Sequence, residues 1–295
     1  KHLPFYADNH LFYITSAGIS LLNISTSESR LLYSNTTEDF FQVPSLYYDD
    51  QLKRLWIGTG SAGLFYYDII RKSLSDIPIR NFPKQPILAI RKDAKNTLLI
   101  GIDGQGIWNI SEKGDTILHI YKEDLNNPFS LRGDGVYDIL CDGSKNWIAT
   151  FTGKLSFFEN NNSQITPVTY QINNPNSLGN NYVNQIIEDH EGHIWFATNN
   201  GVSRWDAASN KWKHYYQNKS EQAKVFLSLC EDNQGHIWAG SYSSGIYLLD
   251  RETGKTLKHY SSKTNTPGFT GDFIFDFFVD KEGDVWIGGN QKLSC

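Results

Sequence analysis

The stretch DHEGHIWFATNNGVSRWD at residues 189–206 decides the fold, because much of it recurs along the chain. The segment DNQGHIWAGSYSSGIYLLD at residues 232–250 has the same order of acidic residue, glycine and tryptophan. An aromatic residue or a leucine stands at the centre of each copy. These anchors are Phe12, Trp56, Leu99, Trp147, Trp195, Trp238 and Trp286, separated by 44, 43, 48, 48, 43 and 48 residues. A period in this range is typical of proteins built from repeated structural units.

Each copy predicts four short β-strands joined by tight turns. Around Trp195 the segments VNQIIED, HIWFAT, VSRWD and KWKHYY read as successive strands. An aspartate six residues before the anchor is expected to cap backbone amides in the first turn. This aspartate is Asp50, Asp93, Asp189, Asp232 or Asp280. A glycine six or seven residues after the anchor is expected to take a positive φ in the second turn: Gly18, Gly63, Gly106, Gly153, Gly201 and Gly245.

Four-stranded units at this period, with an aromatic residue on the second strand, are typical of β-propeller blades. The anchors therefore predict an all-β fold, a seven-bladed β-propeller of four-stranded antiparallel blades in a single domain, residues 1–295. The Trp anchors are interpreted as packing residues. The approximate blades are 1–36, 40–80, 85–123, 134–172, 182–217, 224–261 and 272–295. The last blade is expected to be incomplete or closed by the N-terminal residues 1–8.

Composition limits the classes of partner. The chain has 39% hydrophobic residues, which is ample for a core, and 32 acidic against 27 basic residues give a net charge of −5. No block of Lys or Arg is present, so nucleic acid is not an expected partner. There is also no run of about 18 apolar residues and no signal-peptide pattern at the start. The chain is expected to be a soluble segment of something longer.

Catalytic patterns are not found in the sequence. It contains no GxSxG, no HExxH, no paired cysteine box and no phosphate loop. His193 and His236 hold the same place in their repeats, and we interpret them as exposed repeat residues, not as metal ligands. The recurring aspartates have a turn-capping explanation, so they do not indicate a carboxylate pair. We therefore predict a chain that is not an enzyme, with no catalytic residue, no metal and no cofactor.

A binding site is expected where the loops do not repeat. In a propeller, the turns from second to third strands and the linkers between blades lie on one face. Planar amides, carboxylates and aromatic rings on that face suit the hydroxyls and C–H faces of a sugar. The candidate ligand-binding residues are Asp103, Gln105, Arg132, Asp134, Asn181, Tyr182, Asn199, Tyr242 and Asp272. Phe151, Asn180, Asn200, Phe269, Asn290 and Gln291 lie in the same loops. Turns use Asn, Asp and Gly in any case, and Arg132 with Asp134 equally suits a brace within the linker.

The repeats resemble those of a known family. DHEGHIWFATNNGVSRWD, DNQGHIWAGSYSSGIYLLD and DKEGDVWIGG are similar to the two-component regulator propeller repeat, as are the linkers NNPFSL at 126–131 and NNPNSL at 173–178. The resemblance covers nearly the whole chain and is strongest in the second, fifth, sixth and seventh repeats. It implies the periplasmic sensor region of a Bacteroidetes hybrid two-component histidine kinase, with other propeller, membrane and kinase modules outside this chain.

The resemblance further implies a function in signal transduction and polysaccharide utilization. The segment would bind a glycan-derived oligosaccharide and pass the signal to a cytoplasmic histidine kinase of an inner-membrane sensor. Its partners would be the oligosaccharide, the other domains of the same receptor and a second receptor chain, with the membrane reached only through the rest of the receptor. Two alternatives stay open, a structural or dimerisation propeller with no ligand site and a propeller lyase or glycoside hydrolase.

Overall fold

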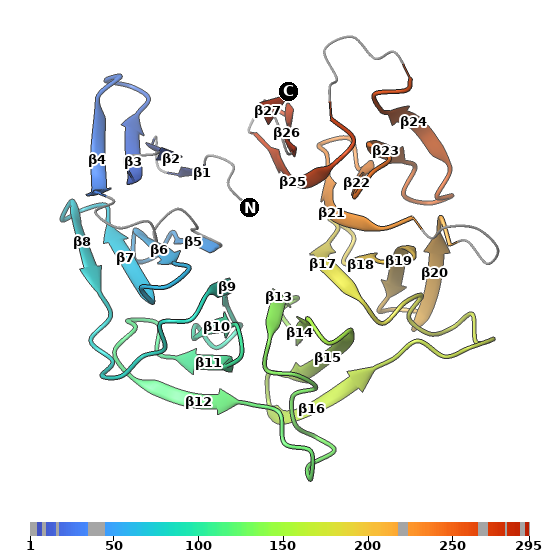
Figure 1. Cartoon of the computed structure of the whole chain (residues 1–295), viewed down its shortest axis with the longest axis horizontal. Coiled ribbons are helices and arrows are strands. Elements are labelled where there is room, and N and C mark those ends of the chain that lie inside the picture. The colour runs from blue at the N-terminus through green and yellow to red at the C-terminus, as the bar shows by residue number, and fades with distance from the viewer. Residues whose placement is uncertain are drawn as a thin grey trace. The chain divides into compact units, whose positions relative to one another are not determined.

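The computed structural model describes residues 5–7, 10–15, 18–34, 45–217, 224–264, 271–280, 282–289 and 293–294. All helix or strand structure in these residues is β-strand, and the strands form seven antiparallel sheets, numbered blades 1 to 7 in chain order (Figure 1). No helix long and apolar enough to cross a membrane is found in this part of the chain. The prediction of an all-β fold made of four-stranded antiparallel units is confirmed.

Strands pair within each blade in the order in which they follow in the chain. Blade 1 contains β1 (Phe5–Ala7), β2 (His10–Thr15), β3 (Gly18–Asn23) and β4 (Ser29–Ser34). Blade 2 contains β5 (Ser45–Asp49), β6 (Arg54–Gly58), β7 (Leu64–Asp68) and β8 (Ser73–Asp76). Blade 3 contains β9 (Ile87–Lys92), β10 (Leu98–Ile102), β11 (Gly106–Ile110) and β12 (Ile117–Tyr121).

The other four blades follow the same scheme. Blade 4 contains β13 (Val136–Cys141), β14 (Lys145–Thr150), β15 (Lys154–Glu159) and β16 (Asn162–Val168). Blade 5 contains β17 (Val183–Glu188), β18 (Ile194–Thr198), β19 (Gly201–Asp206) and β20 (Lys211–Tyr215). Blade 6 contains β21 (Phe226–Glu231), β22 (Ile237–Ser241), β23 (Ile246–Leu249) and β24 (Thr256–Tyr260). Blade 7 contains β25 (Ile274–Val279), β26 (Val285–Gly289) and β27 (Leu293–Ser294).

The N-terminal segment contributes its strand to the first blade. β1 pairs with β2, with Phe5 opposite Phe12 and Ala7 opposite His10. Blade 7 has three strands among the described residues, and β1 is not one of them. Where the structure describes it, the N-terminal segment therefore joins the sheet of blade 1.

The chain divides into two compact units, residues 1–143 and 144–295, and each is described by itself. In the first unit the first strands β5, β9 and β13 lie side by side, and in the second unit β17, β21 and β25 do the same (Figure 1). Successive blades of a unit therefore pack face to face through their first two strands.

Burial falls from the middle of a blade to its far edge. In blade 5 every residue of β18 is buried, whereas in β20 only Tyr215 is buried and Lys211 and Lys213 are exposed. A second strand has neighbouring blades on both faces and thus carries apolar side chains on both. The fourth strand forms the edge of the sheet, where lysine side chains protect the unpaired backbone.

The apolar core lies between neighbouring blades. Trp195 of β18 packs against the ring of Tyr215 with centroids 5.4 Å apart, and both join a cluster with Phe226, Leu229 and Tyr247 of blade 6. Trp56, Trp147 and Trp195 are almost completely buried. These rings fill the space between sheets, which supports the interpretation of the anchors as packing residues.

In blades 2, 3, 5, 6 and 7 the first turn is held by an aspartate. In blade 5 the Oδ1 of Asp189 accepts hydrogen bonds from the backbone N–H groups of Glu191 (3.1 Å) and His193 (2.8 Å), and Gly192 takes a φ of 82°. Asp232 caps its turn in the same way. Blade 2 differs, because there Asp49 caps the backbone of Gln51 and Leu52.

Candidate functional site

The predicted ligand residues lie at one end of the blades, after second strands and before first strands. In blade 5 the N–H of Asn199 donates to the carbonyl oxygen of Tyr182 (3.1 Å), and in blade 6 the N–H of Tyr242 donates to that of Val225 (2.9 Å). These bonds join the two chain segments at the open end of each hairpin. We call the second unit's side chains at these positions the rim: Phe151, Tyr182, Asn199, Tyr242 and Phe273.

The nine predicted residues are divided between the two units. Asp103, Gln105, Arg132 and Asp134 belong to the first unit, and Asn181, Tyr182, Asn199, Tyr242 and Asp272 belong to the second. Only the second set contains exposed aromatic rings, so the rim is the strongest candidate within one unit. Phe269, Asn290 and Gln291 lie outside the described residues.

Three of the predicted residues make the same side-chain hydrogen bond to the linker backbone in different blades. The Oδ1 atoms of Asp134, Asn181 and Asp272 each accept a hydrogen bond from a backbone N–H at the start of the preceding linker, all at 2.7 Å. The donors are Glu123, Tyr170 and Ser262. A side chain that closes a linker by this bond has less capacity for a ligand.

The polar candidates of the first unit also contact their own loops. The guanidinium of Arg132 donates from Nη2 to the carbonyl oxygen of Pro128 (2.7 Å). The side-chain oxygen of Gln105 accepts from Nζ of Lys122 (3.1 Å). The backbone N–H of Asp103 donates to the carbonyl of Pro86 (2.9 Å). The bond from Arg132 to Pro128 supports the interpretation of Arg132 as a residue that braces its linker.

The rim of the second unit presents aromatic rings that are half exposed: 49% for Phe151, 51% for Tyr182 and 52% for Tyr242. The ring of Tyr182 lies directly on Gly153, where an added Cβ would come within 2.7 Å of it. Gly153 also has a φ of 71°, so a side chain is disfavoured there for two reasons. Tyr242 meets Phe273 edge to face, with centroids 5.1 Å apart. These contacts hold Tyr182 and Tyr242 in place while part of each ring faces solvent.

An amide pair stands between the aromatic positions. Nδ2 of Asn184 donates to Oδ1 of Asn199 (2.9 Å) and to the carbonyl oxygen of Phe226 (2.7 Å), which fixes both amides. Within the described residues, Nδ2 of Asn199 and the hydroxyls of Tyr182 and Tyr242 have no hydrogen-bond partner. The rim therefore offers donors and acceptors next to exposed rings, the combination that recognises polyhydroxylated molecules.

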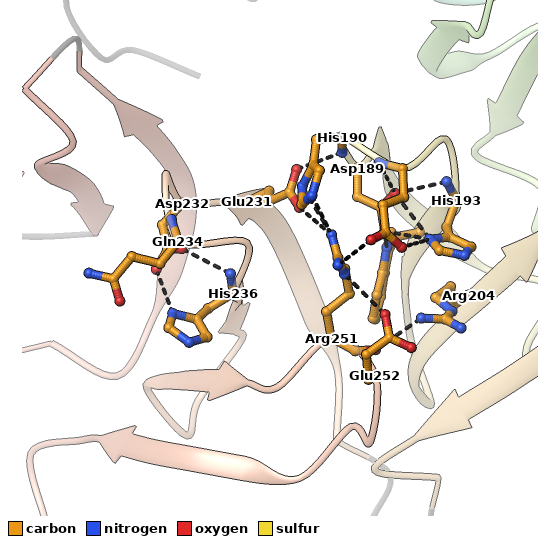
Figure 2. A network of polar contacts seen from close by, with 12 residues as sticks. Asp189, His190, His193, Arg204, Glu231, Asp232, Gln234, His236, Arg251 and Glu252 are labelled. Carbon is orange, nitrogen blue, oxygen red and sulfur yellow. Dashed lines mark hydrogen bonds and ion pairs between the residues drawn. The ribbon is translucent and has the colours of Figure 1, made fainter.

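The opposite end of blades 5 and 6 carries a polar network that Figure 2 shows. Arg251 lies at its centre, with Nη2 at 2.6 Å from Glu191 and Nη1 at 2.8 Å from Nε2 of His190. Nδ1 of His190 lies 2.5 Å from Glu231, and Arg204 donates to the carbonyl oxygen of Arg251 (2.9 Å). The network ties blade 5 to blade 6. Burial disfavours the charge on Arg251, but the surrounding carboxylates outweigh it and raise its pKa.

His193 and His236 are not the exposed residues that their repeat position suggested. The His193 side chain is only 15% exposed, and its Nδ1 lies 3.0 Å from Oδ2 of Asp189. His236 makes the equivalent contact with Asp232 at 3.2 Å. The aspartate that caps each turn also holds the following histidine against it, which accounts for the burial. No group of three His, Cys, Asp or Glu side chains suited to a metal ion occurs in the described part of the chain.

Three segments of the chain, residues 177–200, 220–243 and 268–291, match the family model described as two component regulator propeller. These three segments are similar to the two component regulator propeller repeat. They include the ends of blades 5 and 6 at which the rim and the capping aspartates lie. A comparison with curated protein sequences finds no match.

Solved structures show the same kind of fold as this chain. The extracellular domain ascribed to the hybrid two component system BT3049 from B. thetaiotaomicron aligns with a TM-score of 0.53 and 16% identity over 97% of this chain. The alignment covers 48% of that domain, so the chain spans about half its length. The WD40 β-propeller domain of Doa1 aligns at 0.67 with 13% identity, over 97% of this chain and 88% of that one. The designed protein Ika8 aligns at 0.67 with 12% identity, over 98% and 80%.

Sequence reasoning missed Phe273, Asn184 and the network around Arg251. Phe273 directly precedes a first strand, as Tyr182 does, so its place in the repeat was a usable signal. Asn184 lies inside the strand pattern of VNQIIED and carries no separate signal. Arg251 and His190 are 61 residues apart in the chain, and only the packing of blade 6 on blade 5 brings them together.

Proposed function

We propose that this chain is a ligand-sensing propeller segment of a hybrid two-component sensor, outside the cytoplasm, which binds a glycan-derived oligosaccharide. The observation that carries the proposal is the rim, with half-exposed Phe151, Tyr182 and Tyr242 beside the uncommitted amide nitrogen of Asn199. The regulator propeller repeats and the fold shared with the BT3049 extracellular domain support the placement in a sensor. The periplasm is the expected compartment. A single propeller domain over the whole chain stays a prediction.

The rim suits a sugar for a physical reason. The C–H face of a pyranose packs on an aromatic ring, and its hydroxyls exchange hydrogen bonds with water for bonds with the protein. Tyr182 supplies a ring held on one side by Gly153. Asn199 and the two tyrosine hydroxyls supply hydrogen-bond partners. Because these groups are already fixed by neighbouring contacts, little conformational freedom is lost when a ligand binds.

Signal transfer would use parts of the receptor outside this chain. A bound oligosaccharide shifts a receptor between two arrangements only if it binds one of them more tightly. The proposal therefore places sensing in this segment and the kinase reaction in a cytoplasmic histidine kinase of the same receptor. Other receptor domains and a second receptor chain are the proposed protein partners.

A thermal-shift screen tests the proposed function. The folded chain is heated with neutral and acidic oligosaccharides from plant and host polysaccharides. A ligand at a hundred times its dissociation constant stabilises the folded state by about 2.7 kcal/mol, which raises the unfolding midpoint by several degrees. We expect one neutral class to stabilise the wild-type chain and not the Tyr182→Ala variant. No shift with any saccharide, from protein shown to be folded, would contradict the proposal.

A structural or dimerisation module is the second candidate function, and one observation favours it. Leu125 and Ile172 hold the same place in two linkers and are 89% and 77% exposed. Each linker is closed by a serine hydroxyl, Ser130 or Ser177, that accepts the backbone N–H just before the apolar residue. If these side chains contact a second protein, Leu125→Asp and Ile172→Asp would abolish dimers in light scattering without changing ligand binding. No observation on the described residues favours the alternative of a lyase or glycoside hydrolase.

A further inference from the structure

We propose that the rim binds an uncharged oligosaccharide chain that contacts two separate aromatic pairs at once. The inference rests on the proposed function and adds the length, charge and orientation of the ligand. One pair is Phe151 and Tyr182, grouped by position because they border the neighbouring strands β14 of blade 4 and β17 of blade 5. The other is Tyr242 with Phe273, where blade 6 meets blade 7.

The two pairs are equivalent in the repeat. Phe151 directly follows the second strand β14, as Tyr242 directly follows β22. Tyr182 directly precedes the first strand β17, as Phe273 directly precedes β25. The same aromatic arrangement therefore recurs two blades further along the second unit. A surface that presents one feature twice suits a ligand whose own structure repeats.

The distance between the pairs sets the length of the ligand. β17, β21 and β25 lie side by side in the second unit, so the pairs are two blade steps apart (Figure 1). Sheets packed face to face are about 10 Å apart, which places the pairs at most about 20 Å from one another. One sugar ring can cover only one pair, whereas a short chain of rings can reach both. The Asn199 amide lies between them, in blade 5, where the middle of the chain would pass.

The charge of the rim sets the chemistry of the ligand. The rim side chains themselves are uncharged. Three charged residues lie close to the rim positions, and each has a partner: Asp272 directly before Phe273, Lys154 three residues after Phe151, and Lys224 directly before Val225, whose carbonyl oxygen accepts from Tyr242. Nζ of Lys224 donates to the hydroxyl of Tyr247 (3.0 Å), and Asp272 holds the backbone of Ser262. A carboxylate or sulfate on the sugar would find no cation among the rim side chains themselves, so on this surface it would lose hydration without compensation. A neutral chain avoids this cost.

Calorimetric titration with size series tests the inference. The probes are cello-, malto-, manno- and xylo-oligosaccharides from one to six sugar rings. We expect affinity for the preferred series to rise about tenfold or more from the disaccharide to the hexasaccharide, because the second pair is then engaged. Tyr182→Ala and Tyr242→Ala should each bring hexasaccharide affinity close to that of the disaccharide. Tyr170→Ala is the matched control, since Tyr170 is a similarly exposed tyrosine outside the rim.

The outcomes separate this inference from the proposed function. Equal affinity for short and long chains, or sensitivity to only one of the two tyrosines, would overturn the two-pair mode while ligand sensing stood. Tighter binding of acidic than neutral chains of equal length would overturn the uncharged ligand. Absence of binding by every saccharide to folded protein would overturn both. Circular dichroism of each variant shows that a lost affinity is not a lost fold.

Discussion

The first and second units both bury an anchor tryptophan, but the hydrogen bonding of its indole N–H differs between them. In blade 5 the indole Nε1 of Trp195 donates to Oδ2 of Asp189 at 2.8 Å, and blade 6 repeats this with Trp238 and Asp232 at 2.9 Å. In blade 2 Trp56 is as deeply buried as Trp195, yet its Nε1 has no partner in the described part of the chain. The two blades therefore share the buried ring, while the hydrogen bond to its indole N–H is an addition.

Turn length is the physical cause of the difference. In blade 5 the turn spans residues 189–193, between β17 and β18, and its first residue is the aspartate. In blade 2 the turn spans only residues 50–53, between β5 and β6. The capping role consequently falls on Asp49, at the end of the strand. Asp50, at the predicted position, is exposed and pairs with Lys53 at 2.8 Å. The prediction of Asp50 as the cap is wrong.

The two units also join neighbouring blades with opposite charges at the same place. In the first unit Nζ of Lys92, the last residue of β9, lies 3.1 Å from Asp49 and 2.5 Å from Glu112. In the second unit the equivalent strand end is Glu231, which contacts His190 and Arg251. Either arrangement links a strand end to the previous blade and to the turn between the third and fourth strands of its own blade. The geometry of the repeat determines where a cluster of charged side chains forms. The residue at the strand end can be either the cation or the anion of that cluster.

Removal of the central cation should have the largest effect, and it should differ between the units. Lys92→Ala leaves the carboxylate of Asp49, which is almost fully buried, without its cation, and we expect a loss of about 3 to 4 kcal/mol in unfolding free energy. Arg251→Ala leaves partly exposed carboxylates, so about 1 kcal/mol is expected. Denaturant titration measures both. Equal losses in unfolding free energy for the two variants would show that burial of the carboxylate does not determine the size of the loss.

Removal of the capping aspartate comes next. Asp189→Ala leaves the buried indole N–H of Trp195 and two backbone N–H groups without an acceptor, so we expect a loss of about 3 kcal/mol. Asp50→Ala is the matched control at the same repeat position, and its unfolding midpoint should not move measurably. A control variant as unstable as Asp189→Ala would refute the assignment of the cap to Asp49 in blade 2.

Replacement of the anchor ring by phenylalanine separates packing from hydrogen bonding. Trp195→Phe loses ring volume and leaves Asp189 with one fewer donor, for which about 2 kcal/mol is expected. Trp56→Phe loses similar volume but also removes an unpaired buried N–H, so its cost should be about 1 kcal/mol or less. The difference between the two variants, from thermal or urea unfolding, is the quantity to compare. A larger loss for Trp56→Phe would contradict the account.

The smallest expected effect is on the way stability changes at acidic pH. Burial opposes the charge on Asp189 and Asp232, but hydrogen bonds from Trp and from the turn backbone outweigh it and hold the pKa of each below its usual value. A carboxyl with a lowered pKa contributes stability above the unfolded pKa, near 3.9, and the contribution is lost as pH falls through the folded pKa.

The Asp189→Asn variant should therefore lose less stability than the wild type between about pH 5 and pH 3. Unfolding midpoints in a pH series give the comparison, and parallel curves for the wild type and Asp189→Asn would count against a lowered pKa.

The scaffold was predictable because its signals are local. The spacing of Trp195, Gly201 and Asp189 specifies two turns and the strand between them, and the structure has them in those places. Polar networks such as Arg251 with His190 depend on how one blade packs on the next, which no local pattern encodes. The predicted exposure of His193 failed for a related reason. Its neighbours give no sign that the aspartate four residues earlier binds its ring.

The candidate site was predictable only in part. Residue type and loop position pointed to Tyr182 and Tyr242, whose rings are half exposed in the structure. The same criteria selected Asp134, Asn181 and Asp272, whose carbonyl or carboxylate oxygens close the linkers. Turn-forming and ligand-binding residues have the same chemistry, so sequence alone does not separate them.

The account holds that the repeated core is scaffold and that the rim binds the ligand. The most direct test measures oligosaccharide affinity and unfolding free energy together for Tyr182→Ala and Trp195→Phe. We predict that Tyr182→Ala loses about tenfold in affinity and about 1 kcal/mol or less in stability. Trp195→Phe should lose about 2 kcal/mol in stability and bind within about twofold of the wild type while folded. Wild-type affinity in Tyr182→Ala, or an equal loss of affinity in folded Trp195→Phe, would contradict the account.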